Sequence, residues 1–230
     1  MKVYEINMLV FLLKDINLED AFSEVANFID SGLATIPELL DLHEKNTFKN
    51  YCFNSFYPLE KDKIYKKNKQ YKIQLRTIDE KLAKFFYEKL ANHYNKTIKG
   101  LTADIKIIPK KHIEKLYSIT PTIVKSNDGY WKNSMTLEDF ERRLKENIIK
   151  KNNNFNNIKM SEDFSLYTSI EFKNSKPIAM KYKNVKLLGD KLNIYISDDK
   201  VSQEMAYMLL GTGILEFNGR GAGYVNYKWL

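Results

Sequence analysis

Hydrophobic and polar positions in the first half of the chain follow periods typical of strands and helices in alternation. Residues 2–13 are an apolar run that predicts a buried strand, and amphipathic spacing after it predicts a helix. Asn17 is the expected N-cap of that helix. The further elements that the pattern predicts are strands at 48–57, 70–77 and 101–108 and a helix at 79–95.

The second half repeats this order of elements. Thr136 is the expected N-cap of a helix that ends near residue 149, and residues 150–157 are expected to form a loop, with a frayed helix end as the alternative. The other predicted elements are strands at 119–124, 166–173, 177–187 and 191–196, a helix at 200–210 and a last strand through 227. The sequence therefore predicts an α+β protein of two tandem ferredoxin-like (RRM-like) β-α-β-β-α-β domains, residues 1–111 and 112–230, with a C-terminal glycine-rich loop.

That loop is the most unusual stretch of the chain. Five of the nine glycines fall within residues 211–224, namely Gly211, Gly213, Gly219, Gly221 and Gly223. A helix is expected before them and a strand after them, which is the reverse of a dinucleotide fingerprint, and no Lys-Ser or Lys-Thr pair follows as in a P-loop. The segment is either a tight connection or a backbone contact surface. Arg220 within it favours a contact with phosphate.

The charge balance of the chain indicates a polyanionic partner. Lys and Arg number 37 against 29 Asp and Glu, a net charge of +8. Such an excess suits nucleic acid, although a solvated lysine-rich surface would give the same balance. Within the basic hairpin expected at 61–69, we predict RNA contacts from Lys66, Lys67 and Lys69, with Arg76 in the strand that follows.

Cysteine and histidine usage argues against metal and cofactor sites. Cys52 is the only cysteine, so neither a disulfide nor a cysteine-based zinc site can form within one chain. No His-x-x-x-His or His-Glu-x-x-His spacing occurs. The apolar run at 8–13 is too short to cross a bilayer. We therefore expect a cytoplasmic protein with no metal, no cofactor and no membrane partner.

The three histidines leave one catalytic candidate. His93 near the end of a predicted helix and His112 in a basic linker are expected to have structural or electrostatic roles. His43 lies in an irregular polar segment, where function concentrates, and Lys49 follows it. An imidazole can move protons and a lysine can stabilise charge in phosphodiester cleavage. A His and a Lys at this spacing also occur by chance, so these two residues alone do not decide for catalysis.

Three stretches together resemble one known family over almost the whole chain, the CRISPR-associated endoribonucleases of the Cas-six family in the RAMP superfamily. They are Gly211-Thr-Gly with Gly219-Arg-Gly-Ala-Gly-Tyr224, Leu42-His43 leading into Phe48-Lys-Asn-Tyr-Cys-Phe-Asn-Ser55, and Thr120-Pro-Thr-Ile-Val124. The resemblance puts the family's catalytic histidine on His43 and the transition-state lysine of some members on Lys49.

The resemblance also implies an activity and partners. The activity would be metal-independent cleavage of precursor CRISPR RNA within its repeats, in which the 2′-hydroxyl attacks and leaves 2′,3′-cyclic phosphate and 5′-hydroxyl ends. The partners would be CRISPR repeat RNA, other subunits of a CRISPR effector complex and a second copy in a homodimer.

The sequence is compatible with two alternatives. One is a non-catalytic RNA-binding subunit of a CRISPR ribonucleoprotein, which would not need a histidine at position 43. The other is an RNA-recognition protein outside CRISPR biology, against which the lack of a clear aromatic signature on the predicted strands argues.

Overall fold

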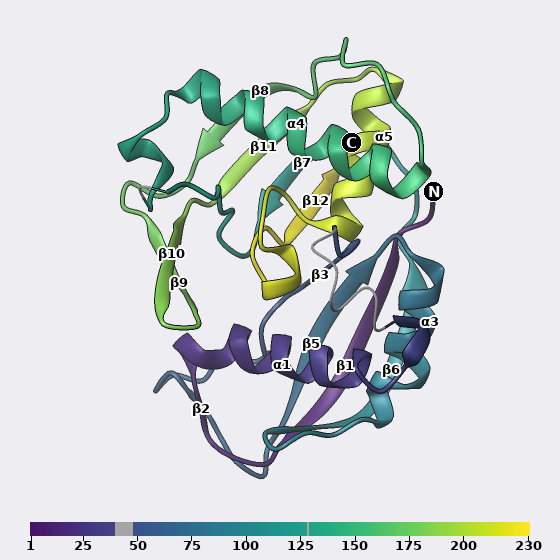
Figure 1. The fold of residues 1–230 in the computed structure, drawn as a ribbon, viewed down its shortest axis with the longest axis vertical. Coiled ribbons are helices and arrows are strands. Elements are labelled where there is room, and N and C mark those ends of the chain that lie inside the picture. Colours follow the sequence, from purple (N-terminus) through teal and green to yellow (C-terminus); the bar gives the residue numbers. More distant parts are fainter. Residues whose placement is uncertain (40–47, 128) are drawn as a thin grey trace.

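The computed structural model describes residues 1–39, 48–127 and 129–230. Two antiparallel four-stranded sheets follow one another along the chain, and helices cover one face of each sheet (Figure 1). The α+β class and the tandem ferredoxin-like architecture predicted from the sequence are confirmed. No helix in the described ranges is both long enough and apolar enough to cross a membrane.

The first sheet has the strand order β3-β5-β1-β6, the order of a ferredoxin-like domain. Its elements are β1 (Tyr4–Leu12), α1 (Ala21–Leu33), β3 (Tyr51–Phe53), β5 (Gln70–Thr77), α3 (Glu80–Glu88) and β6 (Ile98–Ile107), with the short β2 (Ile16–Asn17), η1 (Leu18–Asp20), β4 (Ile64–Tyr65) and η2 (Leu90–Asn92) between them. Alternate residues of β1 (Ile6, Met8, Val10 and Leu12) are 0% exposed, as the period of two predicted.

The start of the first helix differs from the prediction. Asn17 belongs to β2, which pairs with β4, and the turn η1 separates it from α1. α1 begins at Ala21 without a side-chain cap. Pairing of β2 with the basic hairpin thus takes precedence over the local capping signal.

The second sheet has the equivalent order β12-β7-β11-β8. Its elements are β7 (Ile113–Ser118), η3 (Trp131–Asn133), α4 (Leu137–Asn156), β8 (Tyr167–Phe172), β11 (Leu192–Ile196), α5 (Lys200–Thr212), η4 (Asn218–Arg220) and β12 (Val225–Trp229). Between β8 and β11 the chain forms a separate hairpin of β9 (Ile178–Tyr182) and β10 (Val185–Gly189) that extends toward α1 (Figure 1).

Two strands predicted in this half differ from the structure. The opening strand is β7, and residues 119–124 make only isolated bridges, at Thr122 and Ile123. Pro121 between β7 and these bridges has no N–H to donate to a ladder. The strand predicted at 177–187 is the β9–β10 hairpin, which turns at Lys183 with a φ of 53°.

The loop expected at 150–157 is wrong, and the alternative of a helix end is correct, because α4 continues through Asn156. The helix begins as predicted at Thr136, whose side chain forms a capping box with Asp139. It ends at Asn157 in the left-handed conformation. Five asparagines in this stretch favour a loop, but burial of Lys151 and Asn152 against the domain decides the structure.

The two domains meet where β3 and β5 of the first sheet contact α5, and Arg76 of β5 bonds to β12. Gly211 of α5 packs so closely on Ile78 that a Cβ atom at Gly211 would lie 2.7 Å from Ile78 Cγ2. The buried thiol of Cys52 donates to the carbonyl of Leu210 at 3.6 Å. This close contact fixes the glycine-rich loop, which follows α5, against the first domain.

Candidate functional site

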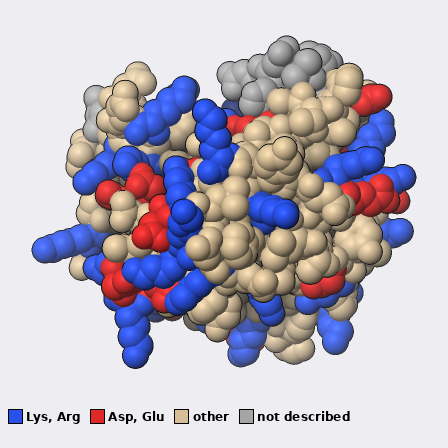
Figure 2. All heavy atoms as spheres, turned by 90° about the horizontal axis from the view of Figure 1, so that it is seen from below, with Lys and Arg blue, Asp and Glu red and all other residues tan. Residues whose placement is uncertain are grey.

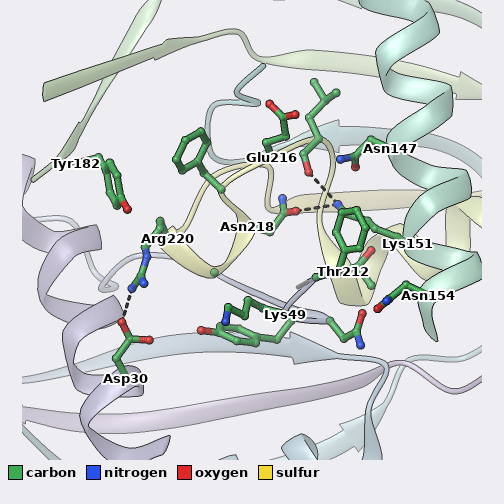
Figure 3. Close-up of a pocket in the computed structure, with 16 residues that line it drawn as sticks. Asp30, Lys49, Asn147, Lys151, Asn154, Tyr182, Thr212, Glu216, Asn218 and Arg220 are labelled. Atoms are coloured by element: carbon green, nitrogen blue, oxygen red, sulfur yellow. Dashed lines mark hydrogen bonds and ion pairs between the residues drawn. The ribbon is translucent and has the colours of Figure 1, made fainter. Parts of the chain in front are cut away.

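A cavity of about 540 Å³ lies between the domains beside the glycine-rich loop (Figure 3). Its size is that of a small-molecule or nucleotide pocket. Its walls come from the end of α1, residues 48–51, one face of α4, the end of β9 and residues 212–220. Segments that are distant in sequence therefore share one site.

The glycine-rich loop folds onto itself. Gly223 has a φ of 67°, and a Cβ atom there would lie 2.0 Å from the carbonyl oxygen of Ile214, so only glycine fits. Asn218 Nδ2 donates to the carbonyls of Ile214 and Ala222, each at 3.0 Å. These contacts hold the loop in one shape.

The five loop glycines, which were predicted to contact RNA, differ in burial. Gly211, Gly213, Gly221 and Gly223 are buried, so the structure does not support a direct contact of their backbone with RNA. Gly219 is only half-buried and lines the cavity. Among the five glycines, Gly219 alone is retained as a proposed contact.

Lys151 of α4 holds the loop from the opposite side. Lys151 is 2% exposed, and its Nζ donates to Gly213 O at 2.8 Å. It also donates to Leu215 O at 2.9 Å and to Asn218 Oδ1 at 2.7 Å (Figure 3). Burial lowers the pKa of Lys151 to about 7, while the three acceptors around Nζ favour its charged form. All three ammonium donors are thus used to fix the loop.

The sequence interpretation missed Lys151 because it falls in the stretch expected to be a loop. One signal does point to it. Lys151 follows Leu144 by seven positions and Ile148 by three, so an uninterrupted helix places it on the same buried face.

Two cationic residues predicted from the sequence, Lys49 and Arg220, line this cavity together. Arg220 Nη1 forms an ion pair with Asp30 Oδ2 of α1, so it links the loop to the first domain (Figure 3). Lys49 is half-buried beneath the loop. Burial lowers the pKa of Lys49 and the charge of Arg220 lowers it further, whereas Asp30 acts in the opposite direction.

His43 lies outside the described residues, so its predicted position at the site stays a prediction. The other two histidines lie away from the cavity. His93 packs on Phe28 with ring centroids 5.5 Å apart, and burial lowers its pKa. His112 is paired with Asp198 at 3.0 Å.

The lysines of the basic hairpin do not reach the cavity. They lie beyond Gln70, at the opposite end of β5 from the domain contact, and an extended strand of this length spans about 23 Å. Lys66 is paired with Asp62, and Lys69 with Glu60 at 3.3 Å. Figure 2, which views this end of the molecule, shows acidic side chains among the basic ones rather than one continuous basic patch.

The predicted RNA contact of Arg76 is not supported. Its side chain is 3% exposed and bonds to Glu5 Oε2 at 2.7 Å, Val225 O at 2.6 Å and Asn226 Oδ1 at 2.8 Å. The guanidinium is therefore committed to the contact between the two domains.

Amide and aromatic groups complete the cavity wall, and the sequence interpretation did not include them. Asn147 lies one helical turn before Lys151 on α4, and Tyr182 and Phe217 approach with ring centroids 5.5 Å apart. Phe217 has a φ of 60°, a conformation that bulky side chains rarely adopt. Only the three-dimensional contact of β9 with the loop reveals this pair.

Acidic, cysteine and histidine side chains do not gather into a metal-binding group of three or more anywhere in residues 1–39, 48–127 and 129–230. The cavity thus combines cationic, amide and aromatic side chains. These groups can bind a phosphate and a planar polar ring.

Sequence comparison finds no matching protein-family model and no curated protein of sufficient similarity. Solved structures do match over nearly the whole chain. One described as "CRISPR associated protein Cas6" is 19% identical over 98% of this chain and 99% of its own, with a TM-score of 0.70. One described as "An RAMP protein binding different RNA substrates" is 17% identical over 98% and 99%, with a TM-score of 0.72.

A third structure, of a Cas6-related protein from Pyrococcus furiosus, is 16% identical over 98% of each chain, with a TM-score of 0.68. At such identities the likeness shows the fold. This chain has the two-domain fold of Cas6 and RAMP structures, and the resemblance expected from the sequence is confirmed at that level.

Proposed function

We propose that this protein is an endoribonuclease of the Cas6 family that cleaves precursor CRISPR RNA within its repeats without a metal ion. The observation that carries the proposal is the cavity between two domains of the Cas6 fold, where Lys49 and Arg220 bring positive charge to the glycine-rich loop. His43 precedes Lys49 by six positions in the sequence and is the catalytic candidate.

The residues support cleavage by internal attack. The 2′-oxygen upstream of the scissile bond forms a bond to phosphorus, and the bond from phosphorus to the 5′-oxygen breaks. His43 would accept the proton of the 2′-hydroxyl or donate a proton to the leaving 5′-oxygen, and solvent water would make the other of these two transfers. Lys49 would stabilise the negative charge that develops on the phosphate oxygens. The products would be a 2′,3′-cyclic phosphate and a 5′-hydroxyl.

A non-catalytic RNA-binding subunit of a CRISPR ribonucleoprotein is the second candidate, because the same fold and the same cationic cavity would serve binding alone. Under this alternative the protein would bind the repeat and leave it intact. Association with other subunits of a CRISPR complex or with a second copy of this chain would be compatible with either function. The proposal therefore includes such proteins as possible classes of partner and does not depend on them.

The test uses a labelled RNA that contains the repeat of the neighbouring CRISPR array, in buffer with EDTA. A matched RNA carries a 2′-deoxy substitution immediately upstream of the cut. We expect cleavage of the first RNA at one position and none of the second. The variant His43→Ala should bind the repeat and cut it at least about a hundredfold more slowly, the range for loss of a general acid or base.

Cleavage that requires an added metal, or equal cleavage of the 2′-deoxy RNA, would contradict the proposed chemistry. Tight binding without cleavage of either RNA would favour the binding subunit. Full activity of His43→Ala would remove His43 from the mechanism.

A further inference from the structure

Two amide oxygens of the cavity wall have no hydrogen-bond partner among the described residues. Asn147 is 9% exposed, and its Oδ1 accepts no hydrogen bond within the described structure; the same holds for Oδ1 of Asn50. Both residues line the cavity. A buried acceptor left unpaired is uncommon and costs stability, so it calls for an explanation. A ligand that brings N–H donors into the cavity supplies one.

An aromatic pair stands at the other side of the same cavity. Phe217 and Tyr182 meet edge to face at 63°, and both are half-buried, so part of each ring stays accessible. The left-handed backbone at Phe217, and at Leu215 with a φ of 57°, is unfavourable for such residues. Strain of this kind concentrates at functional sites, and here it directs an aromatic ring to the cavity.

The positive charge of Arg220 lies on one side of the cavity, which indicates how a ligand would be oriented in it. Figure 3 shows Arg220 and Tyr182 on one side of the cavity and Asn147 with Lys151 on the other. Lys151 uses all three of its donors within the protein, so the ligand-facing part of that wall is the amide of Asn147. A ligand with a planar amine-bearing ring at one end and a phosphate at the other matches this arrangement.

We propose that the cavity binds one unpaired nucleotide of the RNA, with the exocyclic amine of its base donating to Asn147 Oδ1 and its phosphate directed toward Lys49 and Arg220. The assignment rests on the proposed RNA-processing function and adds a base preference to it. Proteins commonly read single-stranded RNA by hydrogen bonds to base edges.

The preference follows from the chemistry of the base edge. Cytosine, adenine and guanine each carry an exocyclic amino group, which satisfies a carbonyl acceptor. Uracil presents a carbonyl oxygen where cytosine has its amine, and that oxygen would leave Asn147 unpaired. Cytosine and uracil are therefore a matched pair of probes for this contact.

The experiment measures fluorescence anisotropy with short labelled oligo(C) and oligo(U) RNAs of equal length at one salt concentration, because affinity for RNA depends on salt. The wild-type protein should bind oligo(C) about tenfold more tightly, the factor expected for one hydrogen bond that is made or lost. Asn147→Leu should lose this preference through weaker binding of oligo(C), with binding of oligo(U) unchanged.

The control is Asn156→Leu, the same substitution at an exposed position of the same helix outside the cavity. It should keep the preference for oligo(C). Equal binding of both RNAs by the wild type, or a preserved preference in Asn147→Leu, would overturn the base assignment and leave the proposed nuclease function standing. Binding of neither RNA would overturn both.

Thermal unfolding gives a second, independent readout. Removal of an unpaired buried polar group should leave the melting temperature of Asn147→Leu unchanged or raise it. A fall of several degrees would mean that the amide supports the fold instead, and the assignment to a nucleotide would be wrong.

Discussion

A lysine that stabilises developing negative charge acts only while it is protonated, and the surroundings of Lys49 oppose protonation. Burial lowers its pKa, and Arg220 adds to this effect, while Asp30 partly compensates. The protonated fraction falls as pH rises through the pKa. If Lys49 stabilises the transition state, the cleavage rate should fall at a lower alkaline pH than an ordinary lysine would allow.

Two variants test this. Lys49→Arg keeps its charge to higher pH, so the alkaline fall in the rate of repeat cleavage should move upward in pH. Lys49→Met should be about a hundredfold slower at neutral pH, as for loss of one charge-stabilising donor. Equal pH profiles for the wild type and Lys49→Arg, or full activity of Lys49→Met, would assign the lysine to binding only.

For single residues, the sequence predicts which cationic side chains are present but not which of them are buried. Lys49 and Arg220 were expected at the site and line one cavity. Arg76 and Lys151 are cationic too, and the sequence offers no direct sign that both are almost fully buried. Charged side chains are rarely buried unless every donor finds an acceptor, and those acceptors come from residues more than 60 positions away.

Among the elements, α4 and the glycine-rich loop depend on each other through Lys151. Lys151→Met would leave the carbonyl of Leu215 and Oδ1 of Asn218 without a donor among the described residues, and we expect the free energy of unfolding to fall by about 2–4 kcal/mol. Amide hydrogen exchange within residues 211–224 should become faster. The measurements are chemical denaturation and hydrogen exchange of the purified protein.

The matched control is the neighbouring Lys150→Met. Lys150 is exposed and pairs with Glu146 at 3.2 Å, so its loss should change stability by less than about 1 kcal/mol. Equal effects of the two substitutions would show that the loop does not depend on the buried ammonium.

Helices and strands with a strong period of apolar residues were predicted from the sequence. Elements whose extent depends on contacts with distant residues were not. The alternation of apolar residues predicts β1, and the capping residue Thr136 predicts the start of α4. The continuation of α4 past residue 149 depends on packing, and the β9–β10 hairpin looks like a sheet strand because its local pattern is that of any strand.

For the molecule as a whole, Arg76 connects the two sheets. It pairs with Glu5 within the first sheet and bonds to Val225 and Asn226 of β12 in the second. Arg76→Met would remove both links and leave Glu5 buried with Lys106 as its remaining ion-pair partner within the described structure. We expect a loss of about 3–5 kcal/mol in the free energy of unfolding.

The cooperativity of unfolding should change as well. Both tryptophans, Trp131 and Trp229, lie in the second domain, so their fluorescence reports on that domain while far-ultraviolet circular dichroism reports on both. The two signals should coincide in the wild type and separate in Arg76→Met. Arg142→Met, at an exposed site, should leave them coincident. Coincident signals in Arg76→Met would mean that other contacts couple the domains.

The tandem arrangement of two domains could be predicted because each repeats one order of elements. The cavity between them could not, since its walls depend on how the domains dock, and docking rests on Gly211 against Ile78 and on the bonds of Arg76. Sequence patterns within one domain carry no information about such contacts.

The β9–β10 hairpin has a consequence for how proteins of this fold can diversify. Phe172 and Leu192 face each other across β8 and β11, so the chain leaves and re-enters the sheet at adjacent positions. A short turn could close these strands without disturbing the sheet order, and a longer insertion could replace the hairpin equally well. Tyr182 at the end of β9 lines the cavity. Evolution can therefore exchange one wall of the site by insertion or deletion, while the two sheets that support the rest of it stay the same.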